Sequence, residues 1–379
     1  MTLGLVAGAP AGAATAAPST LTAIDLGTLG GTFGTAVAVN ASGQVAGEST
    51  TAGDSETHAF FWTRAGGLVD LGTFGGTSSG TNAMSATGQV VGQSATAGNA
   101  ETHAFSWTRA GGMVDLGTLG GTEGVALAVN DGGQVVGESE LANNAGSHAF
   151  SWTQKGGMID LGTLGGTSSG AAAVNASGRV VGSSAIAGDS GAHAFLWTRD
   201  SGMVDLGTLG GTFSFAASVN DRDQVVGASA IAGDAAVHAF SWTREGGMVD
   251  LGTLGGTFVS AHAVSASGQV VGAATLPSAG GPFHAYSWTK TGGFVDLGTL
   301  GGVVSTPSGV NAAGQVVGFS LIAGDTAGHA FSWTQKGGMI DLGTLGGTFS
   351  EARAVNDRGQ VVGGSNITGD AEFHATLWR

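Results

Sequence analysis

The chain has 379 residues, of which 73 are glycine and none is cysteine. Hydrophobic residues make up 42% and charged residues only 10%, enough apolar content for a core, which excludes general disorder. The formal net charge of −15 argues against a nucleic-acid partner, because phosphate binding needs clustered lysine and arginine. The absence of cysteine excludes disulfides, thiolate metal sites and cysteine nucleophiles.

The N-terminal lead, residues 1–19, is small and apolar and ends in Ala14-Thr15-Ala16. It matches the hydrophobic region and cleavage site of a secretory signal, although the basic start is missing. We therefore expect an extracellular or cell-surface protein; the alternative is a disordered lead rich in alanine and proline. No apolar run of 18 residues follows, so no membrane span is predicted.

From Ile24 onward the chain repeats every 45 residues, with one interval of 46. A D-L-G tripeptide begins at each of eight aspartates: Asp25, Asp70, Asp115, Asp160, Asp205, Asp250, Asp296 and Asp341. A second series consists of eight histidines: His58, His103, His148, His193, His238, His284, His329 and His374. Each is followed four residues later by a tryptophan: Trp62, Trp107, Trp152, Trp197, Trp242, Trp288, Trp333 and Trp378.

Each repeat predicts four short β-strands. In one copy, residues 238–243 alternate and are aromatic, 248–251 form a second strand, and a loop opens at 254–257. Strands follow at 261–264 and 269–271. Short strands joined by glycine-containing turns, with no helical periodicity, indicate an all-β fold. Four strands in one such repeat are typical of a β-propeller blade.

The two ends of the chain complement each other. The segment at about 24–28 is a D-L-G strand with no histidine strand before it, and the segment at about 374–379 is a histidine strand with no D-L-G strand after it. We therefore predict that residues 20–379 form a single eight-bladed β-propeller of four-stranded antiparallel blades, closed by pairing of these two strands. By analogy with other propellers, the A-V-N segment is the inner strand and the D-L-G strand the outermost.

The repeated His-Ala-Phe-x-Trp motif, as in residues 103–107, and the A-V-N-x-x-G-x-V-V-G motif resemble the HAF-repeat family of bacterial extracellular proteins. The match covers residues 24–379, with departures at Tyr286, at Ala375-Thr376, and at Ser85 and Ser265, which replace the asparagine. The resemblance implies secretion or surface exposure, and it implies no reaction.

The repeated residues are interpreted as structural, because a residue present in every unit is best explained by what every unit needs. We expect the histidine to hold a hydrogen bond at the strand start and the aspartate to accept from turn amides. Alternation places His238, Phe240 and Trp242 on one sheet face and Ala239 and Ser241 on the other, which predicts large-against-small packing between adjacent sheets.

No cofactor, metal site or catalytic constellation is predicted. Histidine pairs at metal-ligand spacing are absent, and so is a G-x-S-x-G nucleophile motif. The Gly-Asp loops before the histidine strands, such as residues 53–54, contain oxygen ligands suited to calcium. Each loop has one aspartate, however, and an Asx turn is the simpler interpretation.

Ligand binding is expected where the repeats differ. The positions 8, 10 and 12 residues after each D-L-G aspartate vary most, and in an extended segment they share one side. They lead into the inner strand near the channel mouth. The candidate ligand-binding residues in these columns are Phe213, Phe215, Phe258, His262, Phe349, Glu351, Arg353, Asn82 and Glu123.

Strand alternation predicts two oppositely charged faces. The face of the short turns carries eleven of the twelve basic residues and six acids, about +5 in total. The face of the long loops carries thirteen acids and one basic residue, Arg353, about −12 in total. Such a field can steer cationic ligands to the long-loop face; alternatively, the acids only keep a glycine-rich surface soluble.

The leading functional hypothesis is a secreted, non-catalytic binding or adhesion scaffold that presents an acidic, phenylalanine-bearing channel face to a glycan, a peptide or a protein. One alternative is a structural surface or matrix protein that self-assembles face against face and is therefore salt-sensitive, rather than a monomer. Another is a propeller enzyme of the lyase or glycosidase type, with Glu351, Arg353 and His262 as candidates at the channel mouth.

Overall fold

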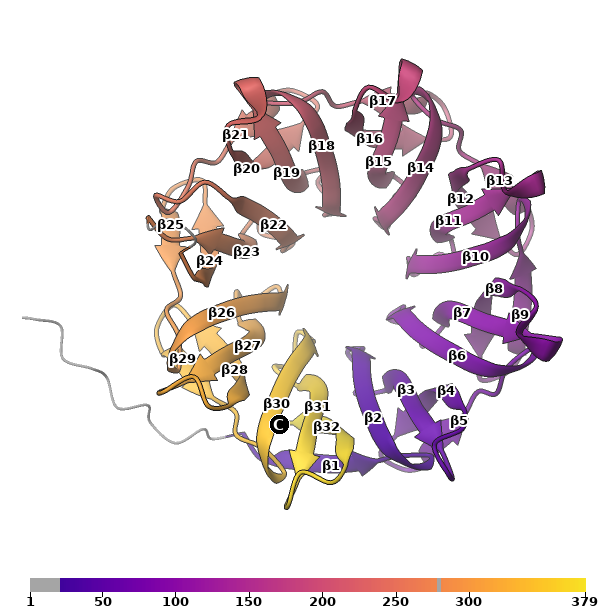
Figure 1. The fold of residues 1–379 in the computed structure, drawn as a ribbon, viewed down its shortest axis with the longest axis vertical. Coiled ribbons are helices and arrows are strands. Elements are labelled where there is room, and N and C mark those ends of the chain that lie inside the picture. Colours follow the sequence, from indigo (N-terminus) through magenta and orange to yellow (C-terminus); the bar gives the residue numbers. More distant parts are fainter. Residues whose placement is uncertain (1–20, 278–280) are drawn as a thin grey trace, which may run out of the picture.

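A computed structural model describes residues 21–277 and 281–379, so the signal-like lead lies outside the described residues. The chain folds into antiparallel β-strands arranged around a common axis (Figure 1). Four short 3-10 turns accompany them, at Ala97–Asn99, Ala142–Asn144, Ala187–Asp189 and Ala232–Asp234. Within the described residues, no helix has the length and apolarity needed to cross a membrane.

Each successive unit contains an inner, a second, a third and an outer strand, named by distance from the axis (Figure 1). The inner strands are β2 (Gly30–Val39), β6 (Gly75–Met84), β10 (Gly120–Val129), β14 (Gly165–Val174), β18 (Gly210–Val219), β22 (Val259–Val264), β26 (Gly301–Val310) and β30 (Gly346–Val355). The second strands are β3 (Val45–Thr51), β7 (Val90–Thr96), β11 (Val135–Leu141), β15 (Val180–Ile186), β19 (Val225–Ile231), β23 (Val270–Thr275), β27 (Val316–Ile322) and β31 (Val361–Ile367).

The third strands carry the His-Ala-Phe motif: β4 (Thr57–Thr63), β8 (Thr102–Thr108), β12 (Ser147–Thr153), β16 (Ala192–Thr198), β20 (Val237–Thr243), β24 (Phe283–Thr289), β28 (Gly328–Thr334) and β32 (Phe373–Trp378). The outer strands are β5 (Gly67–Asp70), β9 (Gly112–Gly117), β13 (Gly157–Asp160), β17 (Gly202–Asp205), β21 (Gly247–Asp250), β25 (Gly293–Asp296), β29 (Gly338–Asp341) and β1 (Ala23–Gly27). Units are numbered by their inner strands, so that β2–β5 form unit 1 and β30–β32 with β1 form unit 8.

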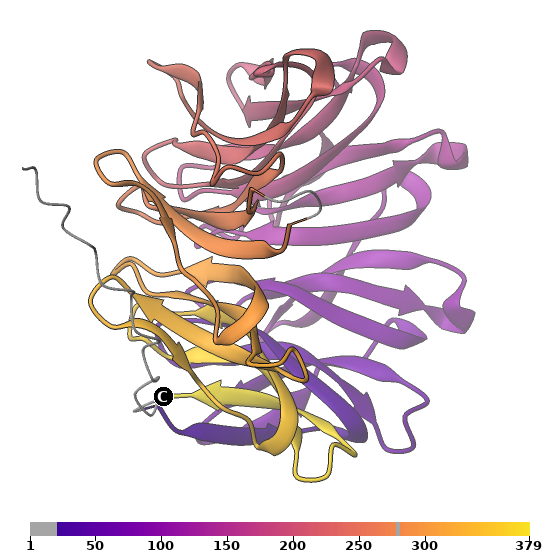
Figure 2. The same cartoon turned by 60° about the vertical axis from the view of Figure 1, so that its left-hand side comes forward.

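The first strand of the chain is the outer strand of the unit that holds its last residues. β1 pairs antiparallel with β32, with Ala23 opposite Trp378 and Asp25 opposite Thr376. Figure 2 shows the indigo β1 running beside the yellow C-terminal strand. This is the pairing that the sequence predicts for the segments at 24–28 and 374–379. β2 of unit 1 also meets β32 through the parallel pair Phe33 and Phe373.

The inner strands are longer than the sequence predicts. In seven units the strand begins at the first glycine of the L-G-G segment, which was expected to be a loop, and it runs for ten residues. Residues outside the strand hold its additional N-terminal residues in place. In unit 1 the Asp54 carboxylate accepts the Thr32 N–H at 2.6 Å, and Leu29 bridges to Thr51. Only in unit 6 does the strand start later, at Val259.

The core lies between neighbouring units. Phe240 of unit 5 is fully buried and packs with Ala194 and Leu196 of unit 4, and Trp242 packs against the same cluster. The predicted large-against-small fit between adjacent sheets is therefore confirmed at this interface. Burying an aromatic side chain contributes about 1.5–3 kcal/mol, and equivalent clusters recur around the fold.

In the six units that have it, the asparagine of the A-V-N motif joins the inner strand to the next unit. In Asn130, Oδ1 accepts the Gln134 N–H at 3.0 Å and closes the turn, while Nδ2 donates to the carbonyl of Asn175 at 2.9 Å. The same bond connects the two ends of the chain, where Asn356 Nδ2 donates to the Asn40 carbonyl at 2.8 Å. This asparagine therefore holds both its own turn and the neighbouring unit.

Candidate functional site

The repeated histidines and aspartates form one pair in every unit. Histidine Nδ1 lies 2.8–3.0 Å from the carboxylate oxygens of the D-L-G aspartate on the adjacent outer strand, as in His193 and Asp205. The aspartate also accepts the N–H of the glycine two residues later, Gly207 in this unit, at 2.7 Å. Each pair therefore ties the third strand to the outer strand. The hydrogen bonds expected of these two series are present, and the structure adds that the histidine and the aspartate are partners of each other.

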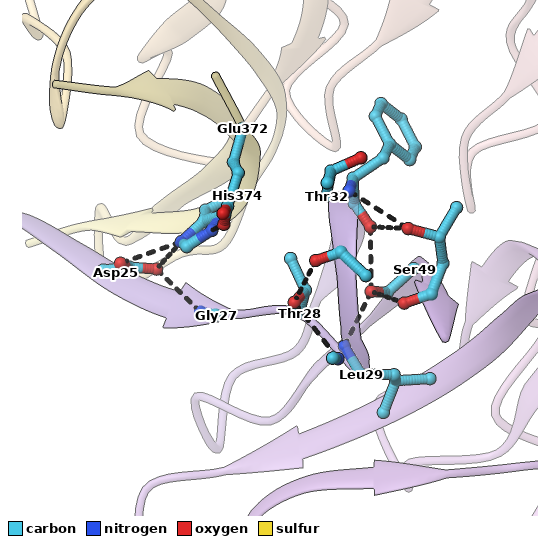
Figure 3. Close-up of polar contacts among 12 residues, drawn as sticks. Asp25, Gly27, Thr28, Leu29, Thr32, Ser49, Glu372 and His374 are labelled. Carbon is cyan, nitrogen blue, oxygen red and sulfur yellow. Dashed lines mark hydrogen bonds and ion pairs between the residues drawn. The ribbon is translucent and has the colours of Figure 1, made fainter. Parts of the chain in front are cut away.

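The same pair holds the two termini together. His374 Nδ1 lies 2.9 Å from both carboxylate oxygens of Asp25, and its Nε2 lies 2.8 Å from Glu372 (Figure 3). Burial of the imidazole works against its protonation, but the hydrogen bonds to Glu372 and Asp25 outweigh burial and raise the pKa of His374. His103 has the same two acidic partners, Asp115 and Glu101, and its pKa is raised for the same reason.

A β-bulge occurs at the same place in every inner strand. The pairing register shifts around the twelfth residue after the D-L-G aspartate, for example between Ala352 and Ala354. The bulge residue is unpaired, so a bulge re-aims its side chain. The bulge positions are Val37, Asn82, Leu127, Ala172, Ala217, His262, Ser308 and Arg353. One of the three columns that vary most in the sequence is therefore also the one that the backbone displaces.

Three of the predicted ligand-binding residues meet in one groove. Phe349, Glu351 and Arg353 of β30 line a groove of about 260 Å³ together with Phe319, and with Thr306 and Ser308 of unit 7. The predicted common side of these three columns is confirmed here. Arg353 pairs with Glu351, its Nη2 and Nε lying 2.6 and 2.8 Å from the carboxylate. Half of the Arg353 side chain is exposed, so the guanidinium can exchange this partner for solvent or a ligand.

A second carboxylate, that of Glu48 in unit 1, interacts electrostatically with Arg353. Burial raises the pKa of Glu48 on β3, and the positive charge of Arg353 works against that increase. Arg353 therefore interacts with two acids, Glu351 beside it and Glu48 on the next unit. Two of the candidates named for the channel mouth, Glu351 and Arg353, thus bind each other.

Four phenylalanine rings form a ladder beside this groove. Ring centroids are separated by 5.5 Å for Phe319 and Phe349, by 6.0 Å for Phe349 and Phe373, and by 5.5 Å for the stacked pair Phe373 and Phe33. The ladder crosses from unit 7 through unit 8 to unit 1. Aromatic pairs at these separations contribute about 0.5–1.5 kcal/mol each beyond the area that they bury.

Two glycines make room for the ladder. A Cβ at Gly328 would collide with the Phe319 ring, and a Cβ at Gly364 would collide with the Phe373 ring. Other units have larger residues in these columns, such as Thr57 in place of Gly328 and Ala228 in place of Gly364. Phe319 and Phe373 thus occur together with the glycines that leave space for their rings. Units 7 and 8 are therefore adapted to hold the ladder.

His262 and Asn82, two further candidates, occupy bulge positions but bind the neighbouring unit. His262 Nδ1 lies 3.1 Å from the Pro307 carbonyl and its Nε2 lies 3.0 Å from Ser260 Oγ. Asn82 Nδ2 donates to the Ala126 carbonyl at 2.8 Å and to Gln93 at 2.7 Å. Both side chains therefore link inner strands, which accounts for them without a ligand.

The remaining candidates stay apart from the groove. Phe258 makes an edge contact with Phe283, with ring centroids 5.8 Å apart, and Phe215 on β18 is 37% exposed. Phe213 pairs in parallel with Ala192, and Glu123 is exposed on β10. The structure thus does not gather the predicted sector into one site: it assembles the part on β30 and leaves the rest distributed around the inner strands.

Sequence reasoning missed Phe319, Phe373 and Glu48. Two further variable columns contain them: the residue after V-V-G, which includes Glu48 and Phe319, and the residue before the repeated histidine, which includes Phe373. The second of these columns pairs with the eighth-position column, as Phe33 does with Phe373. Comparing all columns between the repeats would have identified these residues.

The Gly-Asp loops act as backbone clamps. Besides Asp54, Asp189 accepts the Thr167 N–H at 2.8 Å and Asp234 accepts the Thr212 N–H at 2.8 Å. The hydrogen bonds from Thr50 and Thr32 lower the pKa of Asp54. Across residues 21–277 and 281–379, no group of three or more histidine, aspartate or glutamate side chains could hold a metal ion.

No protein-family model matches the chain, and no curated protein matches it by sequence. Solved structures do. The β-propeller domain of the trilobed protease from Pyrococcus furiosus, described as having an open velcro topology, is similar with a TM-score of 0.52 and 9% identity, over 82% of this chain and 98% of that one. The Dos1 propeller is similar with a TM-score of 0.50 and 10% identity, over 94% of each chain.

TolB from Acinetobacter baumannii, also similar, has 12% identity and a TM-score of 0.41, and the match covers 68% of this chain and 64% of TolB. At such identities the likeness concerns the fold alone. Together with the strand order above, the two fuller matches place this chain among the β-propellers.

Proposed function

We propose that the chain is a secreted, non-catalytic binding protein, an eight-bladed β-propeller closed by β1 on β32, whose inner strands in units 7, 8 and 1 bind a peptide segment with a cationic side chain. The signal-like lead and the HAF-type repeats support secretion. The pairing of β1 with β32 and the bond from Asn356 to Asn40 support closure.

The observation that carries this proposal is the coincidence of a charged pair, an aromatic ladder and a groove at one inner strand, β30. Glu351 and Arg353 line the groove with Phe319 and Phe349. The other seven inner-strand sequences have no oppositely charged pair at the positions of Glu351 and Arg353, so the stability of the fold does not require one. Aromatic side chains and arginine in a partly enclosed site are typical of residues that dominate binding energy.

The size of the groove favours a side chain of a larger ligand. Its volume of about 260 Å³ lies just below the range of about 300–1,000 Å³ that encloses whole small molecules. Glu351 and Glu48 would attract a ligand lysine or arginine, whose methylenes can lie along the phenylalanine rings. The acidic surroundings would steer such a ligand toward the site.

Peptides from a random displayed library, selected on the protein, test this proposal, with a glycan array in parallel. We expect the selected peptides to share a lysine or arginine beside an apolar residue. Phe349→Ala should weaken the best peptide about tenfold or more, as expected at a binding hot spot. Phe215→Ala, a matched change on β18 outside the ladder, should leave the affinity within about twofold.

Two results would overturn the proposal. Equal affinities for the wild type and Phe349→Ala would remove the site from this groove. Binding to glycans but to no peptide would change the ligand class.

A further inference from the structure

A second, larger groove lies at the short-turn ends of units 2, 3 and 4. Its volume is about 1,010 Å³, at the upper end of the range of about 300–1,000 Å³ typical of ligand sites. Its lining consists largely of glycine, serine, threonine and glutamine, with two tryptophans, Trp152 and Trp197, and few aliphatic side chains. A polar wall with aromatic platforms is unlike a protein-docking surface, whose centre is usually apolar.

The two tryptophans lie at the edge of the core: Trp152 packs against the cluster around Phe150 and Trp197 against the cluster around Phe195. Both are partly exposed in the wall of the groove. Among the described residues neither indole N–H has a hydrogen-bond partner. Each indole therefore presents the uncovered part of its apolar ring and a free donor to the groove, a combination that suits the C–H face and the hydroxyls of a sugar ring.

The charge of the groove is positive. Lys155 and Arg199 are exposed on the turns that border it, and neither forms an ion pair within residues 21–277 and 281–379. Arg179 also lines the groove but is bound to Asp223 at 2.6 Å, and Asp200 is the acid in the lining. Two cations thus remain without a carboxylate, on the face that carries most of the basic residues of the chain.

The repeats differ at this groove. Gly132 lines it, at a position where units 5 and 8 have Arg222 and Arg358. Arg179 stands where every other unit has glutamine, and its partner Asp223 stands where the others have glycine. Asp223 is held at a φ of 61°, a backbone conformation that favours glycine, by Arg179 and by Asn175 Nδ2 at 3.0 Å. Two exceptions to the repeat, Gly132 and Arg179, therefore line the groove, and a third, Asp223, holds Arg179 in place.

From these contacts we propose that the groove binds an acidic oligosaccharide. The rings of Trp152 and Trp197 stack on sugar rings, and Lys155 and Arg199 pair with uronate carboxylates. The free indole N–H groups and Gln89, whose Nε2 is fixed at 2.8 Å to Ser106, supply hydrogen bonds to hydroxyls. The site lies at the opposite ends of the strands from the phenylalanine ladder, and it does not depend on the peptide proposed above.

Calorimetric titration of the whole chain with hexagalacturonate and with maltohexaose, a neutral hexaose, tests the site. We expect one hexagalacturonate to bind and maltohexaose to bind about tenfold more weakly or not at all, because charge-assisted hydrogen bonds carry the selectivity. The double change Lys155→Gln with Arg199→Gln should weaken hexagalacturonate about tenfold.

The repeat supplies matched controls. Lys336→Gln with Arg244→Gln removes the same residues from the equivalent turns of units 7 and 5 and should change the affinity less than about twofold. Trp152→Phe should weaken binding, whereas Trp242→Phe in unit 5 should not. Both doubles lie on exposed turns, so their thermal unfolding should match the wild type.

Several results would overturn the proposal. Equal losses from the two doubles would show that net charge alone attracts the sugar. Equal binding of maltohexaose, or no binding of hexagalacturonate, would exclude an acidic oligosaccharide. Tighter binding of single-stranded RNA of equal charge would replace the sugar with a nucleic acid.

Discussion

The outer and inner strands of the fold obey different rules. On the outer side, a histidine–aspartate pair with nearly the same geometry occurs in all eight units, and it even joins the two ends of the chain. On the inner side, the bulge residue ranges from alanine to arginine. Each outer histidine pairs with a repeated aspartate, so both partners must stay alike. The bulge side chains have no such repeated partner, because His262 and Asn82 reach backbone carbonyls of the next unit and Arg353 reaches Glu351, so they are free to differ.

The largest contrast is expected between two phenylalanines of unit 5. Phe240 is fully buried between units, and Phe215 is 37% exposed on the inner strand. Phe240→Ala should lower the free energy of unfolding by about 3–5 kcal/mol, because it leaves a cavity between the sheets. Phe215→Ala should change it by less than about 0.5 kcal/mol. Urea unfolding measures both free energies, and equal losses would show that the exposed Phe215 stabilises the fold as much as the buried Phe240.

Two consecutive glycines of β31 give a finer contrast. A Cβ at Gly363 would collide with the Glu351 carbonyl, whereas the atoms nearest to one at Gly364 belong to the Phe373 ring. Gly363→Ala should cost about 1–3 kcal/mol, as overpacking does, and Gly364→Ala less, because a ring can move. Thermal unfolding measures both. A larger loss from Gly364→Ala would mean that the ladder is as rigid as the repeated framework.

The pair at the termini can be compared with a pair inside a hairpin. Asp25→Asn and Asp205→Asn each remove a partly exposed pair, so each should cost about 1 kcal/mol. Only Asp25 lies on a strand with no turn tethering it to its partner β32. Amide hydrogen exchange in residues 23–27 should therefore accelerate in Asp25→Asn, whereas residues 202–205 should change little in Asp205→Asn. Equal acceleration would show that the connecting turn does not matter.

The smallest effect expected is a pH dependence at His374. Its pKa is raised in the folded protein, so its pair contributes stability below the ordinary histidine pKa of about 6.5. That contribution is lost as the pH rises through the raised value. Glu372→Gln should make the loss of stability with rising pH smaller, by less than about 1 kcal/mol. Thermal unfolding followed across this pH range measures the difference. An unchanged pH profile would show that Glu372 does not contribute.

Much of the fold could be read from the repeat. The eight aspartates, eight histidines and eight tryptophans at a fixed period predicted the order of the strands within a unit and the pairing of the two ends. The alternation of side chains predicted the large-against-small packing that is seen for Phe240 on Ala194. The full length of the inner strands could not be predicted, because it depends on a clamp such as Asp54 on Thr32, two residues 22 positions apart. The candidate site was predicted in part, through Phe349, Glu351 and Arg353.

The sequence by itself determined which positions must be alike and which are free, because the repeat displays this distinction directly. It could not decide which of the free positions meet. Phe319, Phe373 and Phe33 come from three strands far apart in the chain, and they stack only where units 7, 8 and 1 converge. His262 and Arg353 occupy the same bulge column, yet one binds the next unit and the other lines a groove. Only the tertiary structure separates them, because the neighbour that each side chain reaches belongs to another unit.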